Sequence, residues 1–267
     1  MAGAKSLILR PIAVKSGRRF IQRRHYSGQA LNSQWLYVGS FLDERLIGCL
    51  SLGPPINRRL ANRILEGASW ASIIELGRMA FIDETPRNVE SRSLAILCRP
   101  LRKRFPQLEL LQTYADATQC GDGASYRGAG FLLVGINRNR TVMRHRESGK
   151  LISNVRLERN AQLGRGHSRR HARRGDESAK AIAEDMGFEP LPGFQLRYVK
   201  PLREGVKERL TCPIFEYAEI HRRGAGMYRS RRKDPSGPPA NPGGKGRGRT
   251  DPGAPMTGAG EHADESG

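Results

Sequence analysis

The sequence has no long apolar run and no paired cysteine motif. These absences argue against a membrane-spanning protein and against a secreted, disulfide-rich protein. No apolar stretch reaches the ~18 residues that a membrane-spanning helix needs. The first 19 residues have only short apolar runs, broken by Arg10 and Lys15, so they lack the apolar centre of a secretory signal. The four cysteines, at positions 49, 98, 120 and 212, form no CxxC pair and are typical of reduced thiols. We expect a cytoplasmic protein with no membrane partner.

Acidic residues are scarce. The chain has 26 Asp and Glu against 46 Lys and Arg, which gives a formal net charge of +20 and a pI near 10.7. A charge of this size favours a polyanionic partner, DNA or RNA. Solubility alone is the alternative, although a strongly acidic chain would serve solubility equally well. We therefore favour a nucleic-acid partner.

Large apolar residues are also scarce, especially near the C-terminus. Hydrophobic residues make up 37% of the 267 residues, and the segment from Asp234 onward is rich in Gly and Pro. Such a segment cannot bury enough surface to offset its ordering entropy. We predict one domain over residues 1–220 and a basic, disordered tail over 221–267. The tail is either an arm that follows phosphates or a solvated end without a task.

An arginine-rich segment, residues 138–174, interrupts the domain. Its few apolar residues predict surface loop or weak helix. His167 and His171 are four residues apart and suit one helix face. No acidic partner or third ligand lies nearby in the sequence, so a metal site there is disfavoured.

Periodicity predicts a mixed α/β fold with one central sheet flanked by helices. A short helix should follow the last strand, after residue 202. The strand–helix–strand unit at 71–115 should be parallel, and its loops at the carboxyl ends of the strands are where such sheets place ligands. The expected strands are 7–13, 34–41, 45–53, 71–82, 108–115, 131–136 and 194–202, and the expected helices are 15–26, 87–105, 123–129 and 203–210.

Two polar features follow these strands. Arg78 lies at the end of the strand ELGRMAF, and the next helix begins NVESRS, with Ser91 and Arg92 in its first turn. A helix N-terminus attracts anions, so this start suits a phosphate of a donor or of DNA. The alternative is simple capping by Asn88 and Glu90. The start lacks the glycines that let a backbone wrap a pyrophosphate.

The loop YADATQCGDGASYRGAGF, residues 114–131, adds Asp116 and Tyr126. Asp116 follows a strand, where a carboxylate can accept a proton or hold an amino group. Tyr126 can donate a hydrogen bond or stack on a base. Cys120 has no basic neighbour that would lower its pKa, so we interpret it as a bystander. A glycine-rich connection without a task is the alternative.

These residues, with HYSG at 25–28, resemble the Mom proteins of bacteriophages. The motifs HYSG, ELGRMAF, NVESRS and YADATQCGDGASYRGAGF occur in this order over residues 7–136. The resemblance implies a GCN5-related N-acetyltransferase-like fold, in the cytoplasm of a bacterial host. It also implies an enzyme that binds double-stranded DNA and converts adenine to N6-carbamoylmethyladenine, which blocks host restriction.

The resemblance also implies the residues of the active site, which are His25, Tyr26, Arg78, Ser91, Asp116 and Tyr126. Arg78, Ser91 and Arg92 would hold an anionic part of the donor, which is either acetyl-CoA-like or an aminoacyl donor such as glycyl-tRNA. Iron held by His25 and Tyr26 is implied as well. Two alternatives stay open: an N-acetyltransferase acting on a protein or small amine, and a DNA-binding protein without enzymatic activity.

Overall fold

The computed structural model describes residues 6–69, 71–153, 183–228 and 231–232, and its centre is a seven-stranded sheet. All of these residues belong to the unit Met1–Pro235. The strand order is β1-β2-β3-β4-β5-β10-β6, in which β4 and β5 are parallel and every other pair is antiparallel. The strands are β1 (Ile8–Ile12), β2 (Leu36–Leu42), β3 (Arg45–Gly53), β4 (Ile73–Phe81), β5 (Leu110–Asp116), β6 (Leu132–Arg138) and β10 (Phe194–Pro201). The predicted mixed α/β fold is confirmed.

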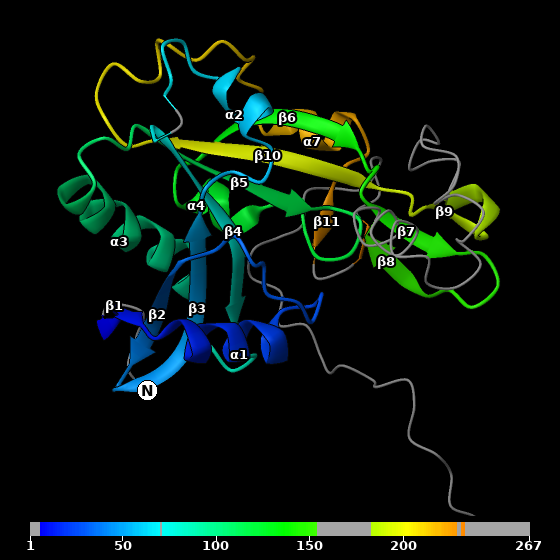
Figure 1. Cartoon of the computed structure of the whole chain (residues 1–267), viewed down its shortest axis with the longest axis horizontal. Coiled ribbons are helices and arrows are strands. Elements are labelled where there is room, and N and C mark those ends of the chain that lie inside the picture. Colours follow the sequence, from blue (N-terminus) through cyan, green and yellow to red (C-terminus); the bar gives the residue numbers. More distant parts are fainter. Residues whose placement is uncertain (1–5, 70, 154–182, 229–230, 233–267) are drawn as a thin grey trace, which may run out of the picture. The chain divides into compact units, whose positions relative to one another are not determined.

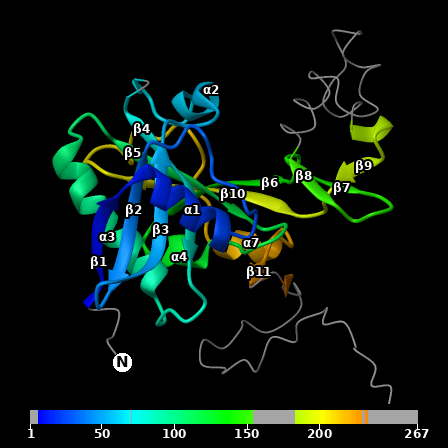
Figure 2. The same ribbon diagram turned by 60° about the horizontal axis from the view of Figure 1, so that its bottom comes forward.

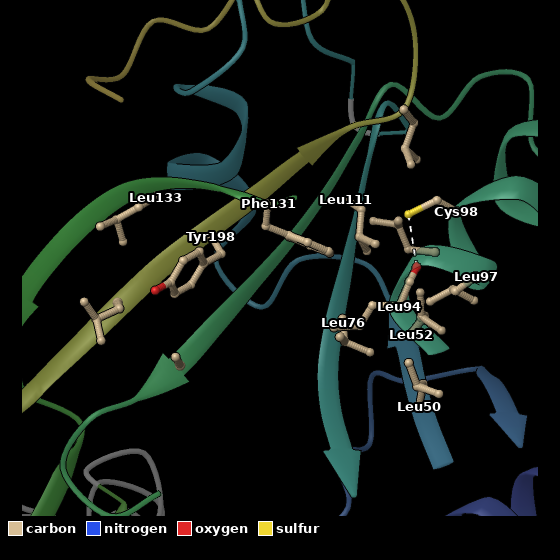
Figure 3. Close-up of a cluster of buried hydrophobic side chains, with 14 of the residues drawn as sticks. Leu50, Leu52, Leu76, Leu94, Leu97, Cys98, Leu111, Phe131, Leu133 and Tyr198 are labelled. Carbon is tan, nitrogen blue, oxygen red and sulfur yellow. Dashed lines mark hydrogen bonds between the residues drawn. The ribbon is translucent and has the colours of Figure 1, made fainter. Parts of the chain in front are cut away.

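One face of the sheet packs against α3 (Val89–Arg104). Leu94, Leu97 and Leu101 recur at spacings of three and four residues and are all buried, as the sequence predicts. They join apolar side chains of the sheet in the main core cluster, part of which is drawn in Figure 3. The helix continues through Pro100, although a proline inside a helix removes a hydrogen bond and favours a kink or a break.

The opposite face of the sheet carries α1 (Val14–Arg24) and α2 (Arg58–Asn62). Ile21 of α1 packs in a buried cluster with Ala80 of β4. Ala61 of α2 packs in another cluster with Ile73, at the other end of β4. Figure 1 shows α1 at the bottom of the view and α2 at the top, and Figure 2 shows α1 in front of the strands, with α3 at the left. The two helices therefore cover the two ends of β4 and leave its middle between them.

The parallel pair β4–β5 separates halfway along. Pairing runs from Ile73–Leu110 to Leu76–Thr113 and then stops, although β4 continues to Phe81 and β5 to Asp116 (Figure 1). A register shift against β3 at the same level makes Gly77 an extra residue in β4. Its small size matters, because a Cβ atom there would lie 2.8 Å from the side chain of Gln34. The bulge brings Arg78 to the point where the strands part.

Several local predictions are wrong. Residues 142–153 form the strands β7 (Val142–His145) and β8 (Leu151–Ser153), which build a small sheet with β9 (Phe188–Pro190), where we expected loop or weak helix. The hydrogen bonds of β7 come partly from β9, which lies far away in the sequence. Residues 203–209 form turns in place of the predicted short helix, and Leu210 bridges to Leu65.

The remaining elements are short. The helices α2 and α7 (Ala218–Arg222) were not predicted, while α4 (Ala124–Gly128) was. Strands β11 (Met227–Tyr228) and β12 (Arg231–Arg232) form a two-stranded ladder. His167, His171 and the end of the tail lie outside the described residues, and the proposed division at residue 220 stays a prediction. No helix in the described part of the chain is long and apolar enough to cross a membrane.

Candidate active site

The first site feature is the end of α1, where the chain turns toward β5. The helix ends at Arg24, and His25 is already extended, with φ −81° and ψ 137°, so the predicted extension of the helix to Tyr26 is wrong. Gly28, at φ +61°, closes a tight turn by donating its N–H to the His25 carbonyl at 2.8 Å. The rings of His25 and Tyr26 lie 4.2 Å apart. They form one aromatic surface, of which the Tyr26 side is 47% exposed.

Asp116, at the end of β5, is the acceptor to which this turn is fixed. The Tyr26 hydroxyl donates to Oδ2 at 2.9 Å across 90 residues of sequence, and Gln119 Nε2 donates to the same oxygen at 2.9 Å. Oδ1 accepts from Gln195 Nε2 at 2.9 Å, from the Thr118 N–H at 3.0 Å and from the Thr118 hydroxyl. Five donors meet the roughly four lone-pair positions of one carboxylate. The Asp116 carboxylate is therefore held rigidly and its acceptor capacity is full.

Arg78 lies close enough to His25 and Tyr26 to affect the ionisation of both side chains. Burial, and then the charge of Arg78, lower the pKa of His25 to about 3, although Asp116 acts the other way. Burial and the Asp116 carboxylate raise the pKa of Tyr26 above its usual range. At neutral pH the site therefore holds a neutral imidazole and a protonated phenol beside a guanidinium. Arg78 donates to the Gly77 carbonyl at 2.8 Å, and its buried Nε has no partner among the described residues.

Sequence reasoning missed a polar strip around these residues. Gln112 receives a hydrogen bond from Arg197 at 2.9 Å and donates one to Glu75 at 2.6 Å. The three side chains are less than 10% exposed, and burial raises the pKa of Glu75. Alternation along the strands puts one set of polar residues on the face of α1 and α2. We call this set the polar strip: Glu75, Arg78, Gln112, Tyr114, Asp116, Gln195 and Arg197.

The alternation of polar residues in FQLRYVKPL was a signal for the β10 members of the strip. Gln195 and Arg197 are two residues apart, so they share one face of that strand. β10 pairs directly with β5, with Gln195 opposite Asp116 and Arg197 opposite Tyr114. That pairing joins residues about 80 positions apart, which local periodicity cannot specify.

Tyr126 lies on the other face of the sheet. Its ring is partly buried and packs against the main core cluster, 5.4 Å from the ring of Tyr198 and 5.6 Å from that of Phe131. Burial raises the pKa of Tyr126 to about 12, although the nearby charge of Arg78 acts to lower it. Arg78 is near residues of both faces because it stands where β4 and β5 separate. Tyr126 therefore lies on the face of the sheet that packs against α3, and the Tyr26–Asp116 pair lies on the opposite face.

Ser91 and Asn88 define the start of α3. The Ser91 hydroxyl donates to the Asn88 carbonyl at 3.1 Å, and a Cβ atom on Gly128 would lie 3.1 Å from Ser91 Cβ. Asn88 has φ +66°, and its side chain makes no capping hydrogen bond, so the predicted side-chain cap is wrong. Glu90 accepts from Ser125 at 2.9 Å. The start of α3 is thus packed against α4.

Cys120 and Asp122 complete the loop. Burial and the carboxylates of Asp116 and Glu90 raise the pKa of the Cys120 thiol, which is the opposite of what a nucleophile requires. Asp122 is buried and pairs with Arg127 at 2.9 Å. Its main chain exchanges hydrogen bonds with Tyr198 and Met227. Asp122 therefore fixes the loop, and the loop positions Asp116.

The donor set does not fit a resident iron. Tyr26 is a protonated phenol already donating to Asp116, the Asp116 oxygens are filled by protein donors, and Arg78 adds a positive charge. The neutral imidazole of His25 is the one ligand left, and a stable site needs several. No group of three His, Cys, Asp or Glu side chains in the described ranges could hold a metal. We assign no step to a metal.

The fold and the site together define the class as a mixed α/β protein with a polar strip where its two parallel strands part. The model of the Mom protein family matches residues 6–219, and the chain belongs to that family. The chain is 27% identical over 215 residues to "Methylcarbamoylase mom" of Escherichia phage Mu, covering 80% of this chain and 83% of the relative.

Solved structures give low-identity matches to acetyltransferases. One is the ribosomal-protein-S18-alanine N-acetyltransferase of Escherichia coli, with 11% identity, a TM-score of 0.39, and coverage of 74% of this chain and 96% of that one. Another is an N-acetyltransferase of Staphylococcus aureus, with 10% identity, a TM-score of 0.40, and coverage of 74% and 99%.

Proposed function

We propose that this protein is a transferase that converts adenine in phage DNA to N6-carbamoylmethyladenine and so protects the DNA from host restriction. Membership of the Mom family and similarity to a protein named methylcarbamoylase support the transferase class. The observation that carries the proposal is the Tyr26–Asp116 hydrogen bond, set in an exposed aromatic surface beside Arg78. It offers an aromatic platform, a proton path and a cation together.

The platform suits a purine taken out of the helix. The N6 amine of a paired adenine is inaccessible for chemistry, so the base must leave the stack. Tyr26 is the exposed aromatic residue at Asp116, and the neutral His25 lies against it. Stacking on such a surface is worth about 1–3 kcal/mol per base, which offsets part of the unstacking cost. Tyr126, an alternative stacking residue in the sequence analysis, packs against the core on the other face of the sheet.

The proton path runs through Tyr26. A bond forms between N6 and the donor carbon while the bond from that carbon to the rest of the donor breaks. The rest of the donor leaves with the electron pair of the broken bond, and one N6 proton must also leave. Asp116 has no vacant lone pair in this arrangement, because five donors already occupy it. The phenol oxygen of Tyr26 can accept the N6 hydrogen while its own proton passes to Asp116 Oδ2. Asp116 therefore acts through Tyr26 as the final proton acceptor.

The donor group lies on the side of Arg78. A buried guanidinium N–H without a partner favours an incoming acceptor atom. Arg78 also stands where the strands part. The helix-terminal N–H groups at the start of α3, the next element along the chain, favour negative charge. We assign the anionic part of the donor to Arg78, with Ser91 and Arg92 contributing from the first turn of α3. An acetyl-CoA-like donor and an aminoacyl donor both have such a part.

The test is nucleoside mass spectrometry of plasmid DNA after expression in bacteria. We expect a new adenosine species heavier by one carbamoylmethyl group in place of hydrogen, and its loss in Asp116→Asn, which keeps the size of the side chain. Glu204→Gln, an exposed acid in a turn, serves as the matched control and should modify normally. Normal modification by Asp116→Asn would overturn the mechanism. Absence of any modified adenosine from the wild type, made soluble in several hosts, would overturn the function.

A further inference from the structure

The helices on either side of the polar strip carry exposed arginines without acidic partners. In α1, Arg19 and Arg23 are exposed, and the helix VKSGRRFIQRR contains no acid. In α2, Arg58 and Arg59 are exposed in the same way. None of the four forms an ion pair within the described part of the chain. Like charges gathered without counterions favour a polyanion as the partner.

Other arginines of the protein are neutralised within it. Arg10 pairs with Glu44 at 2.5 Å, and Arg223 pairs with Glu219 at 2.6 Å. Arg209 pairs with Glu109. Arg99, Arg102 and Arg104 of α3 are also exposed and form no ion pair among the described residues, so it is the position of α1 and α2 beside the polar strip that distinguishes their arginines.

The two helices place these arginines at defined positions relative to the polar strip. α2 packs over Ile73 and α1 over Ala80, on the face that carries the polar strip. Ile73 and Ala80 are seven residues apart, and one of these is the bulge residue Gly77. Six strand steps at ~3.3 Å per residue separate the two packing points by about 20 Å. Tyr26 follows directly after α1, and Leu60 of α2 accepts a hydrogen bond from Arg197 of the strip at 3.4 Å. The two basic groups thus stand at opposite ends of the proposed active site.

We propose that Arg19 and Arg23 on α1 and Arg58 and Arg59 on α2 hold the phosphates of duplex DNA on the two sides of the extruded base. At one phosphate per ~3.4 Å of each strand, a separation of about 20 Å corresponds to about six base pairs, less than one helical turn. Contacts on both sides keep the flanking duplex in place while one base leaves the stack. This inference rests on the proposed function for the identity of the polyanion.

The chain offers a matched control on the other face of the sheet. Arg99, Arg102, Lys103 and Arg104 are exposed near the end of α3, which packs through Leu94, Leu97 and Leu101 against the face opposite the strip. Replacing these four by Gln removes the same charge as replacing the four arginines of α1 and α2. Only the second change should remove phosphate contacts beside the site.

The experiment measures binding to a fluorescent duplex of about three helical turns, without donor, over a series of salt concentrations. Each lost phosphate contact should reduce the slope of log K against log salt by about 0.9, so the quadruple α1/α2 variant should lose about 2 to 4 from its slope. Its affinity at low salt should fall at least about tenfold. The α3 variant should keep the slope of the wild type. Thermal unfolding of both variants checks that the fold is kept.

The other outcomes overturn the proposal. Equal losses in both variants would mean that net charge alone drives binding, and a loss confined to the α3 variant would place the DNA on the opposite face. A deacylated tRNA is measured in parallel, and an α1/α2 variant that loses tRNA binding but keeps duplex binding would make this an RNA surface. Because no chemistry occurs in these assays, failure of the adenine modification leaves their result unaffected, and the two proposals fail separately.

Discussion

Replacing Tyr26 by Phe is the sharpest perturbation of the proposed site, because it removes the hydroxyl and keeps the ring. The hydroxyl donates one of the five hydrogen bonds that Asp116 accepts. A hydrogen bond to a charged group contributes about 1.5–3 kcal/mol. Four other donors remain, and the half-exposed residue admits water. We therefore expect the free energy of unfolding to fall by about 1 kcal/mol or less.

The loss of activity should be much larger than this loss of stability. Removing a positioned proton-transfer group reduces rate by about 10²- to 10⁴-fold, and each tenfold corresponds to about 1.4 kcal/mol of barrier. The phenyl ring in the Tyr26→Phe variant still stacks, so DNA affinity should stay near that of the wild type. Tyr26→Ala should lose activity and also weaken binding to a duplex with a destabilised adenine, by the ~1–3 kcal/mol of one stacked base.

The assay is the rate at which modified adenosine accumulates in plasmid DNA at matched protein levels, measured by nucleoside mass spectrometry. Tyr217→Phe is the control, because Tyr217 is 40% exposed, close to the 47% of Tyr26, and its hydroxyl donates to a main-chain carbonyl outside the polar strip. Tyr217→Phe should keep the normal rate. A normal rate in Tyr26→Phe would refute the proton path.

A double variant tests whether Tyr26 and Asp116 act as one unit. If the proton passes from Tyr26 to Asp116, then Tyr26→Phe combined with Asp116→Asn should be no slower than the slower single variant. Independent roles would instead multiply the two losses. Multiplicative losses would show that Asp116 does not act through Tyr26.

Three further predictions concern stability. The pKa of His25 is lowered to about 3 in the folded state against about 6.5 in the unfolded state. The free energy of unfolding should therefore decrease as the pH falls from about 6.5 toward 3, by at most about 1.4 kcal/mol per pH unit. In urea titrations at several pH values, His25→Gln should show a shallower decrease. Gly123→Ala should lower the free energy of unfolding by about 2–4 kcal/mol, because φ is +84° and the new Cβ would lie 2.5 Å from the Tyr198 ring. Gly149→Ala, at φ +67° with nothing within 4 Å, should lower it by only about 1 kcal/mol. Equal melting temperatures of the two variants would contradict the argument. Asp122→Asn should cost about 3 kcal/mol, since it leaves a buried guanidinium without its carboxylate, and an unchanged urea midpoint would show that this pair does not hold the loop.

The sequence by itself determined the elements whose patterns are local. Alternation or runs of apolar residues predicted the strands of the main sheet, and Leu94, Leu97 and Leu101 predicted the buried face of α3. These patterns are strong because burial of one face is required wherever the partner lies. Local charge and composition also predicted the polyanionic partner, and the ordered motifs led to the Mom family, which the family model confirms.

The tertiary structure decided how those pieces make a site. Tyr26 meets Asp116 across 90 residues, and Gln195 reaches Asp116 only because β10 pairs beside β5. It also separated Tyr126, which the same loop carries, onto the opposite face of the sheet. Side-chain direction alternates along a strand, and strand order depends on pairings between distant segments. The functional arrangement therefore follows from long-range register, which no local pattern in the sequence contains.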